Sequence, residues 1–121
     1  MEFKLIDLNG QEIAEVVGEG QAMEDERGAL DLMAQARELG ARTILLREEN
    51  LPAAFFQLRT KLAGDILNKF AVYRVRLVIV GDFEKVGSKS LRAFILESNR
   101  GDVVYFAQDR EEALRWLGTR D

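Results

Sequence analysis

Charged and amide side chains are concentrated between positions 49 and 101, more densely than a folded core requires. The carboxylates Glu49, Asp82 and Glu97 are able to donate and accept protons. Arg59 and Lys89 are able to stabilise the negative charge that such a reaction develops. The sequence has no histidine and no cysteine, which excludes thiol nucleophiles, structural zinc and serine–histidine–aspartate hydrolysis for this chain alone. We predict no metal site and no cofactor.

The same stretch is the basic part of an acidic protein. It holds 9 basic and 5 acidic side chains, whereas the whole chain has a net charge of −4. This favours a small anionic ligand or an acidic protein partner, and we do not expect nucleic acid. Solvated helix faces without a ligand are the alternative. The binding candidates are Glu49, Asn50, Arg59, Thr60, Gly64, Asp82, Ser88, Lys89, Arg92, Glu97, Asn99 and Arg100.

Several candidates have a local structural explanation that competes with ligand binding. Asn50, Thr60 and Ser88 precede apolar segments of helical spacing and are suited to cap those helices. The free amides at a helix start also attract anions, especially beside neighbouring cations. Asn99 or Gly101 is suited to end a helix in the left-handed conformation. Both interpretations remain open at these positions.

The remaining charged candidates also have alternatives. Asp82 can bind a cation or a ligand hydroxyl, or it can be a turn residue bonded to nearby backbone. Asp65 lies four residues from a lysine on each side, a spacing at which helical side chains pair. Glu97 can pair with Arg100 three residues later, or it can reach toward Arg59.

Gly64 lies inside a predicted helix, where glycine costs about 1 kcal/mol relative to alanine. We expect close approach of another backbone, a ligand or a second subunit to compensate for this cost. Phe55 and Phe56 are able to lie against the same second subunit. The interface of a homodimer is therefore a further interpretation of the stretch, compatible with any function.

The order of apolar segments predicts a single α/β domain with a mostly parallel sheet and an N-terminal hairpin, in the order β-β-α-β-α-β-α-β-α. Asn9-Gly10 is the strongest short hairpin signal. Strands are predicted at 3–8, 12–17, 43–46, 75–80 and 103–106, and helices at 25–39, 60–72, 88–98 and 109–117, with a short helix over 50–58. Ligands of open α/β sheets bind beyond the carboxyl ends of the strands. Glu49, Asn50 and Asp82 therefore share one rim if the third and fourth strands are neighbours.

Many of these positions also carry a family resemblance. Over nearly its whole length the chain resembles the bacterial domain-of-unknown-function 4180 family, through Glu49-Asn50-Leu51-Pro52, Gly81-Asp82-Phe83, Ser88-Lys89 and Glu97-Ser98-Asn99-Arg100-Gly101. That resemblance implies no established activity. The element order is similar to the STAS-like fold of anti-sigma-factor antagonists and their SpoIIAA-like relatives. Those antagonists have an Asp-Ser-Ser-Gly phosphorylation site after the third strand, whereas positions 48–52 contain no serine, so we expect no phosphorylation switch there.

Two functional hypotheses result. The first is a small cytoplasmic regulatory or binding module that recognises an acidic partner or a small anionic ligand through Arg59, Lys61, Lys89, Arg92 and Arg100. The second is a small hydrolase- or transferase-type enzyme, in which a carboxylate acts as acid or base beside an arginine or lysine. No apolar run approaches the roughly 18 residues that a membrane span needs, so no membrane partner is expected.

Overall fold

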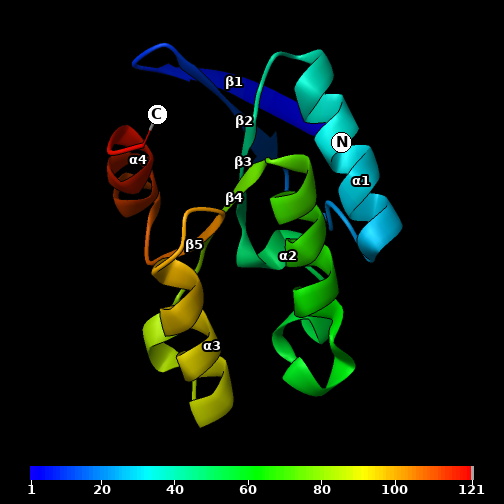
Figure 1. Cartoon of the computed structure of the whole chain (residues 1–121), viewed down its shortest axis with the longest axis vertical. Helices are drawn as coiled ribbons and strands as arrows, with labels where there is room; N and C mark the ends of the chain where they lie inside the picture. Colours follow the sequence, from blue (N-terminus) through cyan, green and yellow to red (C-terminus); the bar gives the residue numbers. More distant parts are fainter. Residues whose placement is uncertain (121) are drawn as a thin grey trace.

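Five strands form one sheet, in the same order in which they occur along the chain. The computed structural model describes residues 1–120 of the 121. The first two strands pair antiparallel and the later ones add in parallel (Figure 1). The strands are β1 (Glu2–Leu8), β2 (Gln11–Val17), β3 (Thr43–Arg47), β4 (Arg76–Val80) and β5 (Val104–Ala107).

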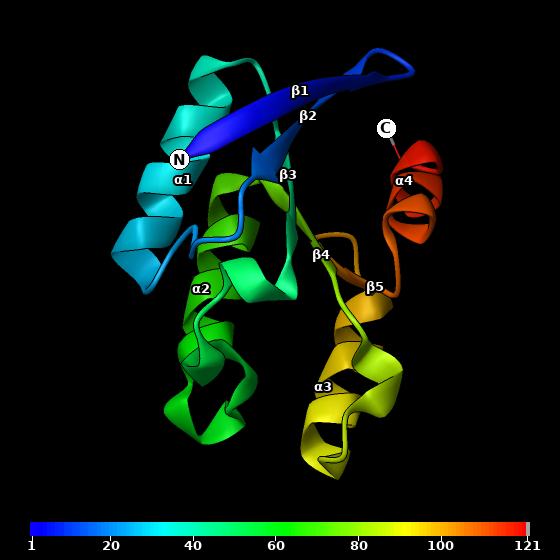
Figure 2. The ribbon, with the colours of Figure 1, turned by 180° about the vertical axis from the view of Figure 1, so that it is seen from behind.

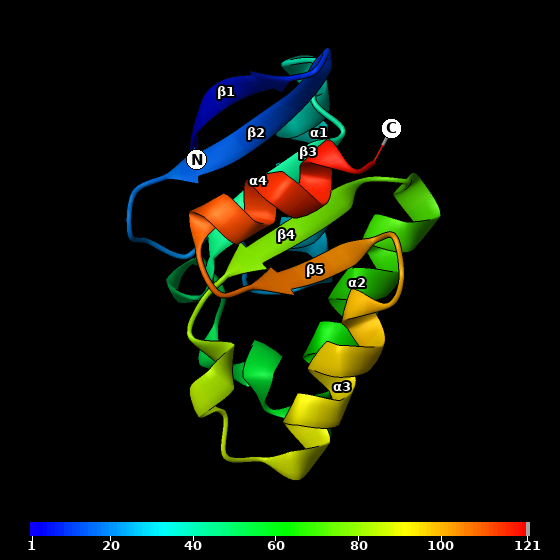
Figure 3. The same cartoon turned by 90° about the vertical axis from the view of Figure 1, so that its left-hand side faces the viewer.

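Four helices cover the two faces of this sheet. They are α1 (Glu26–Glu38), α2 (Leu62–Tyr73), α3 (Lys89–Asn99) and α4 (Arg110–Gly118). Each of the first three helices connects neighbouring parallel strands, and right-handed crossovers made in one direction put all three on the same face. The last helix follows β5 and lies across the opposite face (Figure 3).

Side chains alternate between two cores because successive residues of a strand point to opposite faces. Ile44 and Leu46 of β3 belong to the larger core, with α1, α2 and α3. Leu45 between them belongs to a smaller core, with Ala113 and Leu117 of α4. The view from behind shows how α1 and α2 lie together, whereas α4 is separated from them by the sheet (Figure 2).

Local sequence signals account for the ends of several elements. Asn9 and Gly10 both have positive φ, 54° and 84°, so the predicted Asn-Gly hairpin turn is confirmed. Asp25 caps α1, Ser88 caps α3 and Asp109 caps α4, each by accepting a hydrogen bond from a backbone amide of the first turn. The predicted α/β fold, hairpin and element order are confirmed.

The segment after β3 differs from the prediction. The expected helix over 50–58 is replaced by three short 3-10 turns, Glu48–Asn50, Ala53–Phe56 and Leu58–Thr60. Leu51 is extended, as residues before proline are, and this interrupts the helix at Pro52. Among residues 1–120, no helix is both long enough and apolar enough to cross a membrane.

Candidate functional site

The predicted rim exists, because β3 and β4 are parallel neighbours that end at the same edge of the sheet. Glu49 and Asn50 follow β3, and Asp82 follows β4. Oε1 of Glu49 accepts a hydrogen bond from Nε of Arg47 at 2.6 Å, and Oδ2 of Asp82 lies 3.3 Å from Nζ of Lys85. The side chains of Glu49 and Asp82 are 51% and 53% exposed. Both carboxylates therefore form ion pairs at the surface.

Asn50 is fully buried and supports the backbone of this rim. Its Oδ1 accepts from the amide of Arg47 at 2.9 Å, and its Nδ2 donates to the carbonyls of Gly18 and Gly20 at 3.1 and 2.8 Å. The prediction that Asn50 caps a following helix is wrong, because its side chain instead joins the end of β3 to the loop after β2. Both of its amide hydrogens are used within the chain.

Open α/β sheets tend to bind ligands where the connections after two neighbouring strands pass to opposite faces of the sheet. In this sheet that place lies at the rim beside β4, between β4 and β5, and side chains of the protein fill it. A Cβ atom at Gly81 would lie 2.8 Å from Cδ of Glu48 and 2.8 Å from Cζ of Phe83. Oε1 of Glu48 accepts from the amide of Asp82 at 3.3 Å. The Phe83 ring packs edge-on against Phe106, with 5.2 Å between centroids. The space next to Gly81 is thus occupied by the protein itself.

The candidate cations at the helix starts lie on the surface. Ser88 caps α3 by accepting from the amide of Leu91 at 3.2 Å, as predicted. Lys89 and Arg92 follow it on the same helix, and Arg59 precedes α2; all three are exposed. Within the part of the chain that the structure describes, none of the three forms an ion pair. Their role in binding an anion stays a prediction.

Helix α2 begins at Leu62, two residues later than predicted, because Lys61 has left-handed backbone with φ 63°. The hydroxyl of Thr60 accepts from the amide of Leu62 at 3.2 Å. The same hydroxyl lies 2.7 Å from the carbonyl oxygens of both Ala54 and Gln57, and its single proton is donated to this pair of acceptors. Thr60 thus satisfies one free amide of the helix start, from the position before the N-cap residue.

The structure contradicts two expectations for the neighbourhood of α2 and narrows a third, because compensation for Gly64 by a ligand or a second subunit stays a prediction. A Cβ atom at Gly64 would have nothing within 4 Å, so close approach inside this chain does not compensate for the glycine. Phe55 is 1% exposed in the core of its own chain, so it is not available to a second subunit. Nζ of Lys69 lies 3.8 Å from Glu26 of α1, and this pair replaces the expected one with Asp65.

The candidates at the end of α3 lie apart from those at its start. Helix α3 has 11 residues, so its two ends are separated by roughly 16 Å. Glu97 and Arg100 pair at 3.4 Å with side chains 77% and 79% exposed, one of the two arrangements expected. Neither Asn99 nor Gly101 is left-handed, which corrects the predicted helix stop. The side chain of Asn99 instead bonds to the backbone of Phe106. The structure does not bring all the candidates into one site.

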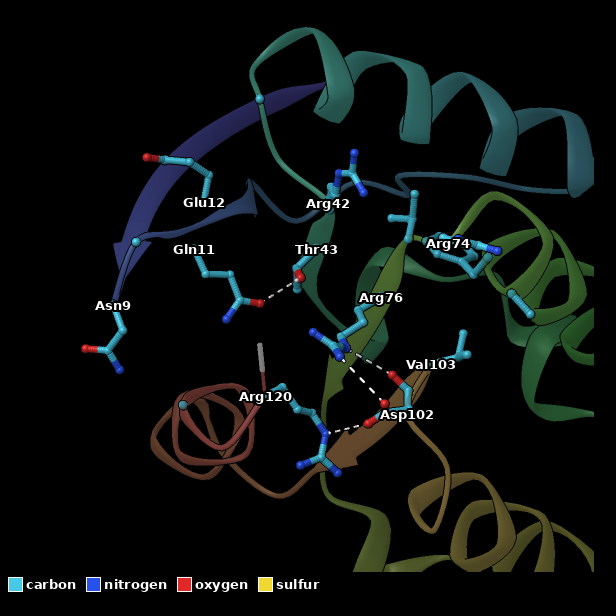
Figure 4. Close-up of a pocket in the computed structure, with 16 residues that line it drawn as sticks. Asn9, Gln11, Glu12, Arg42, Thr43, Arg74, Arg76, Asp102, Val103 and Arg120 are labelled. Carbon is cyan, nitrogen blue, oxygen red and sulfur yellow. Dashed lines mark hydrogen bonds and ion pairs between the residues drawn. The ribbon is translucent and has the colours of Figure 1, made fainter.

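A wide hollow of about 790 Å³ opens at the opposite edge of the sheet, where the parallel strands begin (Figure 4). This volume is in the range of small-molecule sites. Its lining includes four arginines and two carboxylates, which are Arg42, Arg74, Arg76, Arg120, Glu12 and Asp102. We call this feature the arginine hollow.

Asp102 joins two of these arginines. Its Oδ2 lies 3.7 Å from Nη2 of Arg76, and its Oδ1 lies 3.0 Å from Nε of Arg120. Nε of Arg76 also donates to the backbone carbonyl of Asp102 at 3.0 Å. Nε of Arg120 is buried and its N–H is not aligned with the Asp102 oxygen, so this contact is an ion pair without a hydrogen bond.

The guanidinium group of Arg120 connects the arginine hollow to α4. Its Cζ lies 4.0 Å from the centroid of the Trp116 ring, in a cation–π arrangement. That ring stacks on Tyr105, with centroids 4.8 Å apart. The Tyr105 hydroxyl donates to Oε1 of Glu112 at 2.9 Å. Burial, together with this hydrogen bond and the negative charge of Glu112, raises the pKa of Tyr105 above its ordinary value.

Arg42 and Arg74 differ from the other two arginines, because neither has an ion-pair partner among residues 1–120. Both are exposed. Arg74 ends α2 with left-handed backbone, at φ 57° and ψ 46°. That conformation costs a residue with a side chain roughly 1–2 kcal/mol and is usually taken by glycine. An arginine is therefore present at a position where backbone stability favours glycine.

The sequence interpretation missed the arginine hollow, although a signal for it was present. Arg42 comes directly before β3, and Arg74 and Arg76 flank the start of β4. The amino ends of neighbouring parallel strands meet at one edge, so cations placed there lie close together. The general rule that ligands bind beyond the carboxyl ends of parallel strands predicts a site at the other edge of the sheet.

These features define a five-stranded α/β domain with a basic hollow at the amino edge of its sheet. Residues 8–117 match the family described as domain of unknown function (DUF4180). The chain belongs to that family, which confirms the resemblance seen in its sequence. No curated protein and no solved structure matches the chain.

Proposed function

We propose that the protein is a small regulatory or binding module whose arginine hollow takes a small anionic ligand. The observation that carries this proposal is the pair formed by Arg42 and Arg74, two exposed guanidinium groups at a concave surface, without ion-pair partners among residues 1–120. Guanidinium groups bind phosphates and carboxylates through paired hydrogen bonds. Among residues 1–120, four arginines and two carboxylates line the hollow, so this described part of the lining is positively charged and attracts an anion.

The shape favours a small molecule over an acidic protein. A hollow of about 790 Å³ accommodates a metabolite-sized ligand, whereas protein partners usually bury a wider surface. The cations predicted from the sequence, Arg59, Lys61, Lys89, Arg92 and Arg100, remain an alternative surface for an acidic partner.

The enzyme hypothesis has less support. Its candidate carboxylates Glu49, Asp82 and Glu97 are more than half exposed, and each forms an ion pair with a neighbouring cation. A general acid or base needs a substrate held within hydrogen-bond reach. An exposed carboxylate with a cation of its own chain beside it is poorly suited to that role.

The proposed setting is the bacterial cytoplasm. The β-β-α-β-α-β-α-β-α order supports a STAS-like relationship, as found in modules that act by binding. This part of the proposal rests on fold-level analogy. A homodimer is compatible with it, and light scattering measures the oligomeric state directly.

The test is a calorimetric titration with inorganic pyrophosphate at constant ionic strength. We expect the double variant Arg42→Gln/Arg74→Gln to bind about tenfold or more weakly, because hydrogen bonds to charged groups contribute about 1.5–3 kcal/mol each. The matched control Arg59→Gln/Arg92→Gln removes the same charge from exposed positions outside the hollow. Its affinity is expected to stay within about twofold of the wild type.

Two results would contradict the proposal. If the control pair loses binding and the hollow pair does not, the anion site lies with the cations predicted from the sequence. If pyrophosphate binds neither to the wild type nor to Asp102→Asn, which removes the carboxylate paired with Arg76 and Arg120, the hollow is not an anion site.

A further inference from the structure

We propose that Asp102 acts as an internal competitor in the arginine hollow, and that the preferred ligand carries two anionic groups. In this arrangement one group binds Arg42 and Arg74, and the other displaces the Asp102 carboxylate from Arg76 and Arg120. The inference rests on the proposed function and names the class of its ligand and a residue that controls its affinity.

The geometry divides the four arginines into two pairs. Arg76 and Arg120 are linked through the Asp102 carboxylate, at 3.7 and 3.0 Å, whereas Arg42 and Arg74 have no such partner among residues 1–120. In Figure 4, Arg120 and Arg42 extend from opposite sides of the hollow, with Arg76 between them. An anion with a single charged group can bind Arg42 and Arg74, which have no ion-pair partner among residues 1–120. A second anionic group on the same ligand would have to take the position of the Asp102 carboxylate.

The Asp102 carboxylate is held in a way that permits displacement. Its side chain is 72% exposed, whereas those of Arg76 and Arg120 are 22% and 23% exposed. Rotation of Asp102 into solvent therefore leaves the packed arginines in place. The buried Nε of Arg120 has no aligned acceptor, so an oxygen that approaches along its N–H direction would bind it better than Asp102 does.

The protein contains its own reporter of this displacement. Trp116 is the single tryptophan of the chain, and Cζ of Arg120 lies 4.0 Å from its ring centroid. A ligand that draws the guanidinium group toward itself changes the environment of the indole. We expect a saturable change in tryptophan fluorescence with pyrophosphate, and a much smaller change with orthophosphate.

The experiment compares full-length wild type with Asp102→Asn and Glu97→Gln, by calorimetry and tryptophan fluorescence, using pyrophosphate at constant ionic strength. Glu97→Gln is the matched control, because Glu97 is also an exposed carboxylate paired with an arginine but does not line the hollow. We expect Asp102→Asn to bind about fivefold more tightly than the wild type, the scale of losing one exposed ion pair. The control should change by less than about twofold.

The outcomes separate this inference from the proposed function. If the wild type binds through Arg42 and Arg74 but Asp102→Asn behaves like Glu97→Gln, or binds more weakly, Asp102 is not a competitor and the anion site stands. If neither the wild type nor Asp102→Asn binds pyrophosphate, both ideas are wrong. Thermal melting without ligand checks folding, and Asp102→Ser replaces Asp102→Asn if the latter does not fold.

Discussion

The side-chain amide of Asn99 makes two hydrogen bonds with the backbone of Phe106. Its Oδ1 accepts from the Phe106 amide at 2.8 Å, and its Nδ2 donates to the Phe106 carbonyl at 3.2 Å. Phe106 lies in β5, the edge strand beside β4, so these backbone groups face away from the sheet. Unpaired groups at a strand edge invite pairing with other chains. Asn99 therefore replaces the missing neighbour strand at this position.

Replacing Asn99 with alanine is expected to lower the free energy of unfolding by about 1–3 kcal/mol, because two backbone groups of Phe106 lose their partner. Urea denaturation measures the change, and Ser98→Ala on the same helix turn is the control. Wild-type stability in Asn99→Ala would contradict this structural role and return Asn99 to the list of ligand-binding candidates.

Asn50→Ala should destabilise the protein at least as much as Asn99→Ala. It removes the donor for two carbonyl groups, those of Gly18 and Gly20, and the acceptor for the amide of Arg47. Unsatisfied buried groups cost about 1–3 kcal/mol each. Asn50→Asp keeps the acceptor and loses the donors, so we expect it to be destabilised as well. Unchanged denaturation midpoints for both variants would rule out this role.

Gly64→Ala is expected to stabilise the protein by about 1 kcal/mol, because alanine is the better helix former and the added methyl group meets open space. Thermal and urea unfolding measure the gain. If Gly64 lies in a homodimer interface, the same substitution weakens the dimer in light scattering. Lower stability in a variant that remains monomeric would contradict the helical explanation.

Arg74→Gly is expected to raise stability by about 1 kcal/mol while weakening pyrophosphate binding, because glycine relieves the left-handed backbone but removes a guanidinium group from the hollow. Lys61→Gly is a matched control, since Lys61 is also left-handed, at φ 63°, and does not line the hollow. It should gain stability with unchanged binding. Equal binding by both variants would exclude Arg74 from the site.

We expect the free energy of unfolding to fall at alkaline pH, because Tyr105 ionises there. Burial, followed by the hydrogen bond and charge of Glu112, raises its pKa in the folded state. The folded protein therefore holds this proton more tightly than the unfolded chain does, whose tyrosine pKa is about 10. The resulting stabilisation is complete below that value and is lost as pH rises through the folded-state pKa.

The measurement uses a Tyr73→Phe background, in which Tyr105 is the remaining one of two tyrosines. Tyrosinate absorbance should show ionisation at a higher pH in folded than in denatured protein. Tyr105→Phe should flatten the alkaline decline of the unfolding free energy, and Glu112→Gln should reduce the upward pKa shift. Identical titration curves for folded and denatured protein would contradict the prediction.

The element order, the hairpin and the caps were predictable because they depend on residues close together in the sequence. Asn9-Gly10 adopts the turn that its backbone preferences favour, and Asp25, Ser88 and Asp109 cap helices whose amides lie three residues away. A shared rim of Glu49, Asn50 and Asp82 was expected if β3 and β4 were neighbours. The two strands are neighbours, so the rim is present.

The partners of individual side chains depended on tertiary structure. Asn50 bonds to carbonyls about thirty positions earlier in the chain, and Asn99 bonds across a connection to β5, so local patterns mistook both for helix-end residues. Phe83 occupies space at the rim because its ring packs on Phe106. The spacing of residues in the sequence does not predict that contact.

The sequence by itself determined the fold, the family and the presence of excess positive charge in the middle of the chain. Only the tertiary structure decided at which edge of the sheet a basic hollow forms. The physical reason is that these arginines come from three separate parts of the chain. Arg42 precedes β3, Arg74 and Arg76 lie at the start of β4, and Arg120 follows α4, so the three parts become neighbours only after folding. Their shared electrostatic field exists only after folding.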